Sequence, residues 1–289
     1  MCGILAYFGN NLSKIDFKSS LEKMNHRGPD ATGTYFNDGV MLGHKRLSIL
    51  DLSNSSNQPF KYGDYLIVFN GEIYNYIELK KQYKLNPKTS SDTEVLLLMY
   101  IKFGKECLQK LNGMFSFIIY NEITKEVFIA RDRLGIKPLY IYQKNKEIIL
   151  ASEIASILKL RSSELDEFGI RQYQKLRMTL KDYTIYNDIK QFPAGSYFLN
   201  NKIKKYWNLD PVETSNPSDI ELEELIYSSV DLRKRSDVPL GTYLSGGLDS
   251  TILTYLIKPN HTWTVGFEEM NEFKWTDLAS ELLHSKHHK

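Results

Sequence analysis

The sequence predicts an α+β domain followed by the beginning of an α/β unit with a parallel sheet. Up to about residue 210, groups of strand-like segments alternate with helical stretches, which favours sheets covered by helices. A segment rich in Pro, Asn, Ser and Asp follows and is typical of a linker. Beyond it, strands and helices alternate one by one, as in a parallel sheet. We therefore expect a first domain at 2–210, a linker at 211–218 and a second, partial domain at 219–289.

Seven strands are expected in the first domain, because each segment has β-branched and aromatic residues and is bounded by Gly or Asn-Asp breaks. They are Gly3–Phe8, Val40–Arg46, Tyr65–Asn70, Met114–Tyr120, Glu126–Arg131, Leu139–Gln143 and Ile148–Ala151. Helices are expected at 72–83, 91–104 and 152–160. The helix at 91–104 has a capping-box start, with Ser91 or Asp92 before Glu94, and a glycine stop at Gly104. Residues 162–210 are expected to add short strands and a closing hairpin.

The second domain is expected to contain two strand–helix units after a first helix. The predicted helices are 219–235, 248–257 and 275–284, and the predicted strands are 238–244 and 261–267. Such a short α/β unit would leave edge strands and apolar helix faces bare. We therefore expect an N-terminal fragment, a split gene product or a truncated gene.

Composition narrows the class of protein. Hydrophobic residues make up 42% of the chain and charged residues 25%, which is typical of a packed core. The net charge of +2 gives no reason to expect a nucleic-acid or membrane partner. Two cysteines cannot form a disulfide framework, no leader precedes Cys2, and the apolar runs are too short to span a bilayer, so we expect a cytoplasmic protein. Cys107 is expected to be a packed core residue. The histidines of "HSKHHK" are not expected to bind a metal, since zinc needs four ligands in fixed geometry.

Cys2 is the first candidate for chemistry. The initiator Met is normally removed before a small residue, so the mature chain is expected to begin at Cys2. A free α-amine has an ordinary pKa of about 7.7–8.0 and can take the thiol proton without a histidine. The alternative is a chance cysteine in a buried first strand, and Cys2 alone does not decide between them.

The segment "VFNGEIYN" offers hydrogen-bond donors for a tetrahedral oxyanion. Asn70 is expected to end a strand, and Gly71 to turn the chain with an exposed N–H. A side-chain amide and a backbone N–H form a sufficient pair, each donor contributing about 3 kcal/mol. The alternative is a plain Asn-Gly turn between strands.

Two charged residues could hold the ends of a free amino acid. Arg46, at a strand end, can clamp a carboxylate, and Asp92, at a helix start, can receive an ammonium. The alternatives are a surface arginine and a helix cap. Together with a thiol and an oxyanion pair, these groups describe a site for glutamine, from which ammonia would be released.

The motifs "CGI", "HRGPD", "RLSI", "NGEIYN", "SDTEV", "GMFSF", "RDRLGIKPLY" and "ASE" follow one another through residues 2–210. As a set they resemble the class II glutaminase domain of asparagine synthetases, an N-terminal-nucleophile αββα sandwich that needs no cofactor. The resemblance implies Cys2 as the nucleophile and Asn70 with Gly71 as the oxyanion hole. It implies that glutamine is also bound by Arg46, Leu47, Ile49, Leu50, Glu72 and Asp92.

The segment "YLSGGLDST" is a second candidate site. A strand is expected to run into Ser245-Gly246-Gly247 before a helix begins near Leu248, and amides at a helix N-terminus can cradle phosphate. No Gly-Lys-Ser/Thr follows, so it is not a Walker A loop. The segment resembles the SGGxDS loop of ATP pyrophosphatases. This implies nucleotide contacts from Leu244, Ser245, Gly246, Gly247, Asp249, Ser250 and Val265, with Asp249 helping to hold Mg²⁺.

The resemblance implies a glutamine-dependent asparagine synthetase that uses glutamine, aspartate, ATP and Mg²⁺ and passes through an aspartyl-AMP intermediate. A second glycine-acid loop of that family is absent from the sequence, so we expect glutamine hydrolysis alone from this chain. A homodimer or a separately encoded C-terminal half would be the protein partner. The alternatives are a related amidotransferase acting on another carboxylate and a non-catalytic binding or regulatory remnant.

Overall fold

The computed structural model describes residues 1–209, 218–269 and 271–289. The chain divides into two compact units, Met1–Asp210 and Pro211–Lys289. The linker predicted at 211–218 lies outside the described residues except for Ser218. Each unit is therefore considered by itself.

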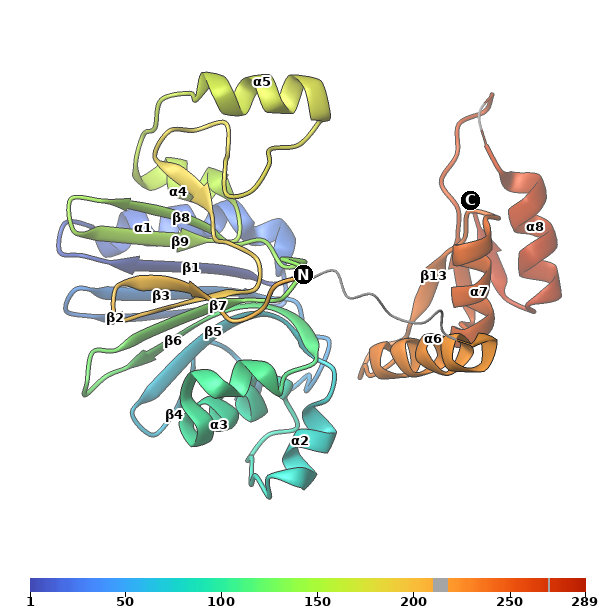
Figure 1. Ribbon diagram of the computed structural model, residues 1–289, viewed down its shortest axis with the longest axis horizontal. Coiled ribbons are helices and arrows are strands. Elements are labelled where there is room, and N and C mark those ends of the chain that lie inside the picture. The colour runs from blue at the N-terminus through green and yellow to red at the C-terminus, as the bar shows by residue number, and fades with distance from the viewer. Residues whose placement is uncertain (210–217, 270) are drawn as a thin grey trace. The chain divides into compact units, whose positions relative to one another are not determined.

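The first unit is a sandwich of two antiparallel sheets with helices on both outer faces (Figure 1). The first sheet has the order β10 (Ile189–Gln191), β8 (Tyr140–Lys144), β9 (Glu147–Ala151), β1 (Gly3–Phe8), β3 (Val40–Arg46) and β2 (Ala31–Asn37). The second has the order β12 (Lys202–Lys205), β11 (Ser196–Leu199), β7 (Val127–Arg131), β6 (Gly113–Asn121), β5 (Tyr65–Ile73) and β4 (Phe60–Tyr62). The expected αββα sandwich is confirmed.

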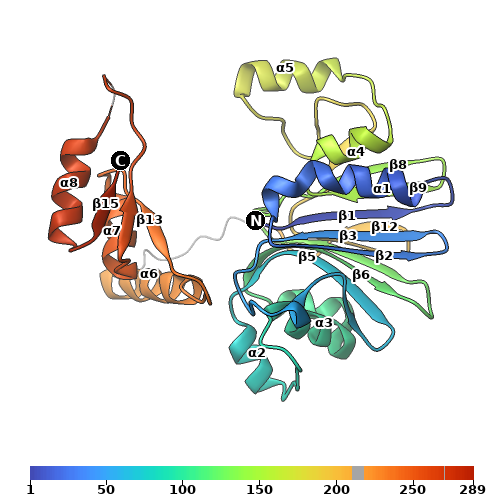
Figure 2. The same ribbon diagram turned by 180° about the vertical axis from the view of Figure 1, so that it is seen from behind.

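Different helices cover the two outer faces, as the view from behind also shows (Figure 2). Helices α1 (Lys14–Leu21) and α4 (Ile154–Leu160) contact each other and the first sheet. Helix α3 (Asp92–Phe103) packs on β4 and β5 of the second sheet, and α2 (Tyr76–Gln82) packs on α3. Helix α5 (Glu167–Leu176) lies at the α4 side of the unit (Figure 1).

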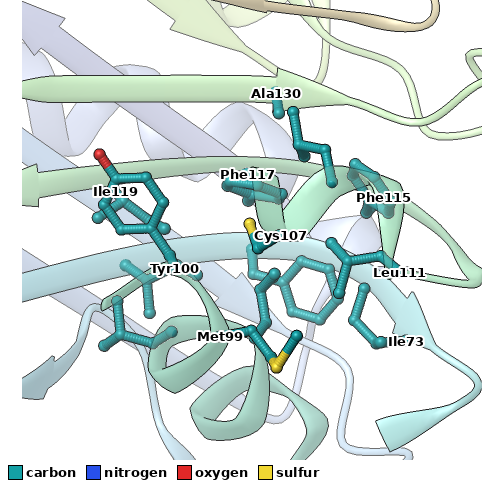
Figure 3. Packing of buried hydrophobic residues seen from close by; sticks show 14 of the residues in the cluster. Ile73, Met99, Tyr100, Cys107, Leu111, Phe115, Phe117, Ile119 and Ala130 are labelled. Carbon is teal, nitrogen blue, oxygen red and sulfur yellow. The ribbon is translucent and has the colours of Figure 1, made fainter. Parts of the chain in front are cut away.

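The core consists of one layer between the sheets and two layers under the helices. Alternate side chains of β1 and β5, such as Ile4 and Val68, meet between the sheets. The opposite faces of the same strands, with Leu5 and Phe69, pack under the helices. Figure 3 shows the layer under α3, in which Cys107 is fully buried among aromatic and aliphatic side chains, as expected.

The structure differs from the predictions where the pattern was short or irregular. Strands β2 and β4 and helices α1 and α5 were not predicted, and "YTIY" forms only an isolated bridge between Leu165 and Tyr186. Helix α2 begins at Tyr76, later than expected, because β5 continues to Ile73.

The second unit has a parallel sheet in the order β13 (Gly241–Tyr243), β14 (His261–Trp263) and β15 (Lys286–His288). Its helices are α6 (Asp219–Arg233), α7 (Leu248–Ile257) and α8 (Phe273–Leu282). The predicted α/β alternation is confirmed. Large apolar side chains lie exposed here, including Leu248 and Val265, as expected for bare faces. Among the described residues, no helix is both long and apolar enough to cross a membrane.

The inter-sheet layer should dominate the stability of the first unit. Leu42 is fully buried there, so Leu42→Ala should lower the free energy of unfolding by about 2–5 kcal/mol through lost burial and a cavity. The exposed Ile123 is the control, because Ile123→Ala should change it by less than about 0.5 kcal/mol. Urea unfolding followed by fluorescence measures both. Equal effects would contradict this account of the core.

Candidate active site

A cavity of about 200 Å³ opens where β1 begins and β3 ends. It is lined by all nine residues assigned to glutamine chemistry from the sequence, namely Cys2, Arg46, Leu47, Ile49, Leu50, Asn70, Gly71, Glu72 and Asp92. It is also lined by eight residues that were not predicted, namely Met1, Ser56, Gln58, Phe69, Ser91, Thr93, Met114 and Lys137. The fold thus gathers segments up to residue 137 into one pocket.

Cys2 is held by main-chain groups on both sides of its thiol. The thiol donates to the Leu47 carbonyl at 3.7 Å and accepts from the Leu47 N–H at 3.5 Å. Its own carbonyl accepts a 2.9 Å hydrogen bond from Nε of Arg27. Burial raises the pKa of the Cys2 thiol, so at rest the sulfur keeps its proton. A nucleophilic role would therefore require a base close by.

Asn70 presents a buried amide with no hydrogen-bond partner. It lies on β5 on the same face as Leu66 and Val68, which point between the sheets. Its side chain is 1% exposed, and neither Nδ2 nor Oδ1 is hydrogen-bonded within the described part of the chain. Leaving a buried amide unpaired costs about 1–3 kcal/mol. An arrangement that bears this cost beside a cavity is suited to bind a ligand.

Gly71 does not turn the chain, which corrects the expectation from the sequence. Strand β5 continues to Ile73, and Gly71 pairs with Phe115 in β6. A Cβ here would lie 2.2 Å from the carbonyl oxygen of Met114, so close strand pairing requires glycine. The plain Asn-Gly turn is therefore wrong for this segment.

The amide of Gly71 points toward the cavity edge of β5, because alternate amides of a strand point to the same side. The two neighbouring N–H groups on that side of the strand donate hydrogen bonds to side chains. The Phe69 N–H donates to Oε1 of Gln58 at 2.6 Å, and the Ile73 N–H donates to Oδ2 of Asp92 at 2.8 Å. The Gly71 N–H lies between these two bonds along the strand. Asn70 and Gly71 line the same cavity, although they belong to a strand and not to a turn.

Asp92 lies in the cavity with one carboxylate oxygen held by the Ile73 N–H. Burial, together with the smaller effect of the Glu72 charge, raises the pKa of Asp92 to about 7, although the hydrogen bond from the Ile73 N–H opposes this shift. Burial also raises the pKa of Glu72. Two acids whose charge is disfavoured by burial would both gain from a bound cation.

The capping box expected at the start of α3 is wrong. Ser91 is the N-cap and accepts from the Thr93 N–H, whereas Asp92 is not the cap. The Glu94 carboxylate accepts from the backbone and hydroxyl of Thr89 in the preceding loop. The cap on Ser91 leaves Asp92 free to face the cavity.

Arg46 is almost fully buried and orders the loop that follows β3. Its terminal nitrogens donate to the carbonyls of Leu50, Asp51 and Ser53 and to Oδ1 of Asn57. These four bonds exclude a simple surface arginine. The clamp on a carboxylate stays a prediction, because in this conformation the loop uses the terminal N–H groups.

Sequence reasoning missed Gln58 and Lys137. Gln58 is buried and links β5 to α3, since Nε2 donates to the Thr93 hydroxyl while Oε1 accepts from Phe69. Lys137 follows the turn after β7, in "GIKPLY". Lys137 lies in the motif "RDRLGIKPLY", which was the signal that could have found it. Gln58 lies in none of the motifs that carry the resemblance, so no such signal was available for it.

The candidate nucleotide loop lies between β13 and α7. Gly246 has a φ of +73°, and a Cβ there would lie 2.6 Å from Cβ of Trp275, so this position requires glycine. The hydroxyls of Ser245 and Ser250 lie 2.9 Å apart across the loop. Gly247 is the N-cap of α7 and has no side-chain cap, which leaves first-turn amides available to an anion.

The residues predicted around this loop lie at one edge of the parallel sheet. The Leu244 N–H donates to the Trp263 carbonyl at 2.8 Å, which brings the ends of β13 and β14 together. Val265 and Asp249 are exposed nearby. The described residues contain no group of three or more His, Cys, Asp or Glu arranged for a metal, the C-terminal histidines included. The role of Asp249 in holding Mg²⁺ stays a prediction, compatible with the one or two carboxylates that Mg²⁺ uses beside phosphate oxygens.

Comparison with known proteins finds a family model for each of two parts of the chain. Residues 1–207 match the family model described as a glutamine amidotransferase domain, and residues 221–289 match the model described as asparagine synthase. The chain is 33% identical to a putative asparagine synthetase [glutamine-hydrolyzing] 2 of Methanocaldococcus jannaschii, covering all of this chain and 64% of that protein. It is 38% identical to asparagine synthetase [glutamine-hydrolyzing] 1 of Bacillus subtilis, covering 97% of this chain and 48% of that protein.

A solved structure confirms the fold. The glutamine phosphoribosylpyrophosphate amidotransferase from B. subtilis superposes with a TM-score of 0.54 at 20% identity, covering 72% of this chain and 50% of the other. The chain spans about half to two thirds of the length of the two asparagine synthetase relatives. Because the first family model covers most of the chain, the chain belongs to the glutamine amidotransferase domain family.

Proposed function

We propose that the first unit hydrolyses the side-chain amide of glutamine to glutamate and ammonia, with Cys2 as the nucleophile. The observation that carries this is the buried, unpartnered Asn70 amide in the same cavity as the Cys2 thiol and the Gly71 N–H. In this proposal the Asn70 amide is a donor that would stabilise the tetrahedral oxyanion.

The reaction begins with proton removal from the Cys2 thiol. The α-amine of a chain that begins at Cys2 is the proposed base. In the described chain, burial lowers the pKa of the Met1 α-amine. For an α-amine on the neighbouring Cys2 we propose the same effect, which favours the neutral form that can accept a proton. Sulfur then attacks the amide carbon, and the carbonyl oxygen becomes an oxyanion between Asn70 Nδ2 and the Gly71 N–H. The amine returns its proton to the departing nitrogen, ammonia leaves, and water cleaves the thioester to release glutamate.

Recognition of free glutamine is assigned to other residues that line the cavity. The carboxylate of Asp92 would receive the α-ammonium, with Glu72 adding negative potential. Arg46 supplies positive charge for the α-carboxylate and holds the loop containing Leu50. The main chain around Leu47, Ile49 and Leu50 would bound the substrate.

For the whole protein we propose asparagine synthesis, in which the ammonia amidates aspartate through aspartyl-AMP. The support is the match of the second unit to the asparagine synthase model and the similarity to named asparagine synthetases. Ser245, Gly246, Gly247 and Ser250 would hold phosphate, Leu244 and Val265 would contact the adenine nucleotide through their main chain, and Asp249 would face Mg²⁺. ATP supplies the activation of the acceptor carboxylate.

Two alternative functions can be distinguished from this proposal by simple measurements. An amidotransferase for another carboxylate would share the glutaminase site and differ in its acceptor. A binding or regulatory module would show no turnover. Ammonia release from glutamine decides against the module, and product analysis with different acceptors decides between the amidotransferases.

Removal of the nucleophile or of the oxyanion donor tests the proposal directly. Cys2→Ala should abolish ammonia release while glutamine still binds, because the thiol is not a recognition group. Asn70→Ala should lower kcat about 10²–10³-fold. Asn10→Ala, at an exposed position, is the control and should keep the wild-type rate. Coupled ammonia assays and calorimetry measure these effects, and persistent turnover in Cys2→Ala would refute the assignment.

The pH dependence of glutamine binding tests the role of Asp92. Because the pKa of Asp92 in the free protein is about 7, the carboxyl is neutral below this pH and charged above it. KM for glutamine should therefore fall as the pH rises from about 6 to 8. Asp92→Asn should raise KM at pH 8 about 10–100-fold and flatten this trend. Asp16→Asn, at the exposed start of α1, is the control and should change neither KM at pH 8 nor its dependence on pH. An unaltered trend in Asp92→Asn would assign the pH effect to another group.

A further inference from the structure

Lys137 is a buried lysine in the active-site cavity that the proposed mechanism does not use. Its side chain is 6% exposed, and it lines the same cavity as Cys2 and Glu72. Its backbone is fixed, since its N–H donates to Oδ2 of Asp132 at 3.0 Å and its carbonyl accepts from Nε of Arg131 at 2.9 Å. The turn that carries Lys137 is therefore held in place by hydrogen bonds.

The ammonium of Lys137 has no hydrogen bond or ion pair with any of the described residues. Lys45 offers the comparison within the same unit. It is equally buried, but its ammonium donates to Oε1 of Glu22 at 2.7 Å and to the Thr32 hydroxyl at 2.9 Å. A buried charge is costly unless it is paired. Lys45 has the contacts of a structural lysine, and Lys137 does not.

The charged groups around Lys137 come from several elements. Glu72 on β5, Asp132 after β7, Arg27 before β2 and the Cys2 thiol all act on it electrostatically. The amino terminus is further affected by Asp30, and the thiol by Asp92 and Arg46. Lys137 is thus one of the cations at the nucleophile end of the cavity.

We propose that Lys137 is a positioning residue whose unpaired ammonium favours the thiolate of Cys2 and the neutral form of the adjacent α-amine. This inference rests on the proposed glutaminase function. A positive charge near a thiol stabilises the thiolate, and the same charge near an amine opposes its protonation. Both effects keep the nucleophile and its base ready at neutral pH, although burial alone would keep the thiol protonated.

The electrostatics of the amino terminus agree with this role. In the described chain, burial lowers the pKa of the Met1 α-amine, and the charges of Arg27 and Lys137 also lower it. Cys2 is the next residue, so its α-amine in a chain that begins at Cys2 would lie near the same two cations. Arg27 is committed to other contacts, since it donates to the Cys2 carbonyl and to Glu153. Lys137 is therefore the cation whose charge can be removed without breaking a hydrogen bond to the nucleophile.

The test compares Lys137→Met, which removes the charge, with Lys137→Arg, which keeps it. The rate of Cys2 alkylation by iodoacetamide is measured against pH, with Cys2→Ala as the blank for the buried Cys107. The pH dependence of kcat/KM for glutamine is measured in parallel. Lys144→Met is the control, because Lys144 is exposed and pairs with Asp188.

In Lys137→Met, the pH midpoint of the alkylation rate and the acid limb of kcat/KM should both move to higher pH. At pH 7 this shift should slow alkylation about tenfold. Lys137→Arg and Lys144→Met should keep the wild-type midpoints. Lys137→Gln is measured in the same way if Lys137→Met does not fold. Unchanged midpoints in the neutral variant, or equal losses in the methionine and arginine variants, would overturn the inference. If the wild-type protein does not turn over glutamine, the proposed function fails, whereas alkylation still decides the role of Lys137.

Discussion

The alternation of hydrogen-bonding directions along β5 is the constraint on which the site depends. Pairing with β6 uses one edge of the strand and leaves every second amide on the other edge. Gln58 and Asp92 take the amides of Phe69 and Ile73, so the Gly71 N–H is the amide between them that faces the cavity. The same alternation turns the Asn70 side chain between the sheets. The proposed oxyanion hole would therefore be built from regular sheet geometry, and a rigid sheet can hold its donors in place before substrate arrives.

Polar and charged side chains buried at the cavity lower the free energy of unfolding of the first unit. The unpaired Asn70 amide, the Asp92 carboxyl and the Lys137 ammonium each lack the full set of partners that a core residue would have. The three apolar layers of the sandwich offset this cost. These groups surround one small cavity. In the proposed function, their unmet interactions would bind a charged amino acid and stabilise an oxyanion.

The sequence predicted the regular parts of the fold and residues that the structure gathers in one cavity, and it failed where the geometry depends on distant partners. Strand Gly3–Phe8 and helix α7 were found from local pattern alone. The turn expected at Gly71 was wrong, because Asn-Gly is a local turn signal and the close approach of β6 overrides it. The positions of Gln58 and Lys137 in the cavity could not be predicted, because each depends on how segments that are far apart in the chain pack together.

The central claim is that the Cys2 thiol attacks a substrate of glutamine shape in this cavity. Mass spectrometry after reaction with a diazoketone analogue of glutamine tests it most directly, because the analogue alkylates the thiol that attacks its carbonyl region. The account predicts one adduct on Cys2, none on the buried Cys107, and protection by excess glutamine. Absence of an adduct on Cys2, or labelling that glutamine does not slow, would contradict it.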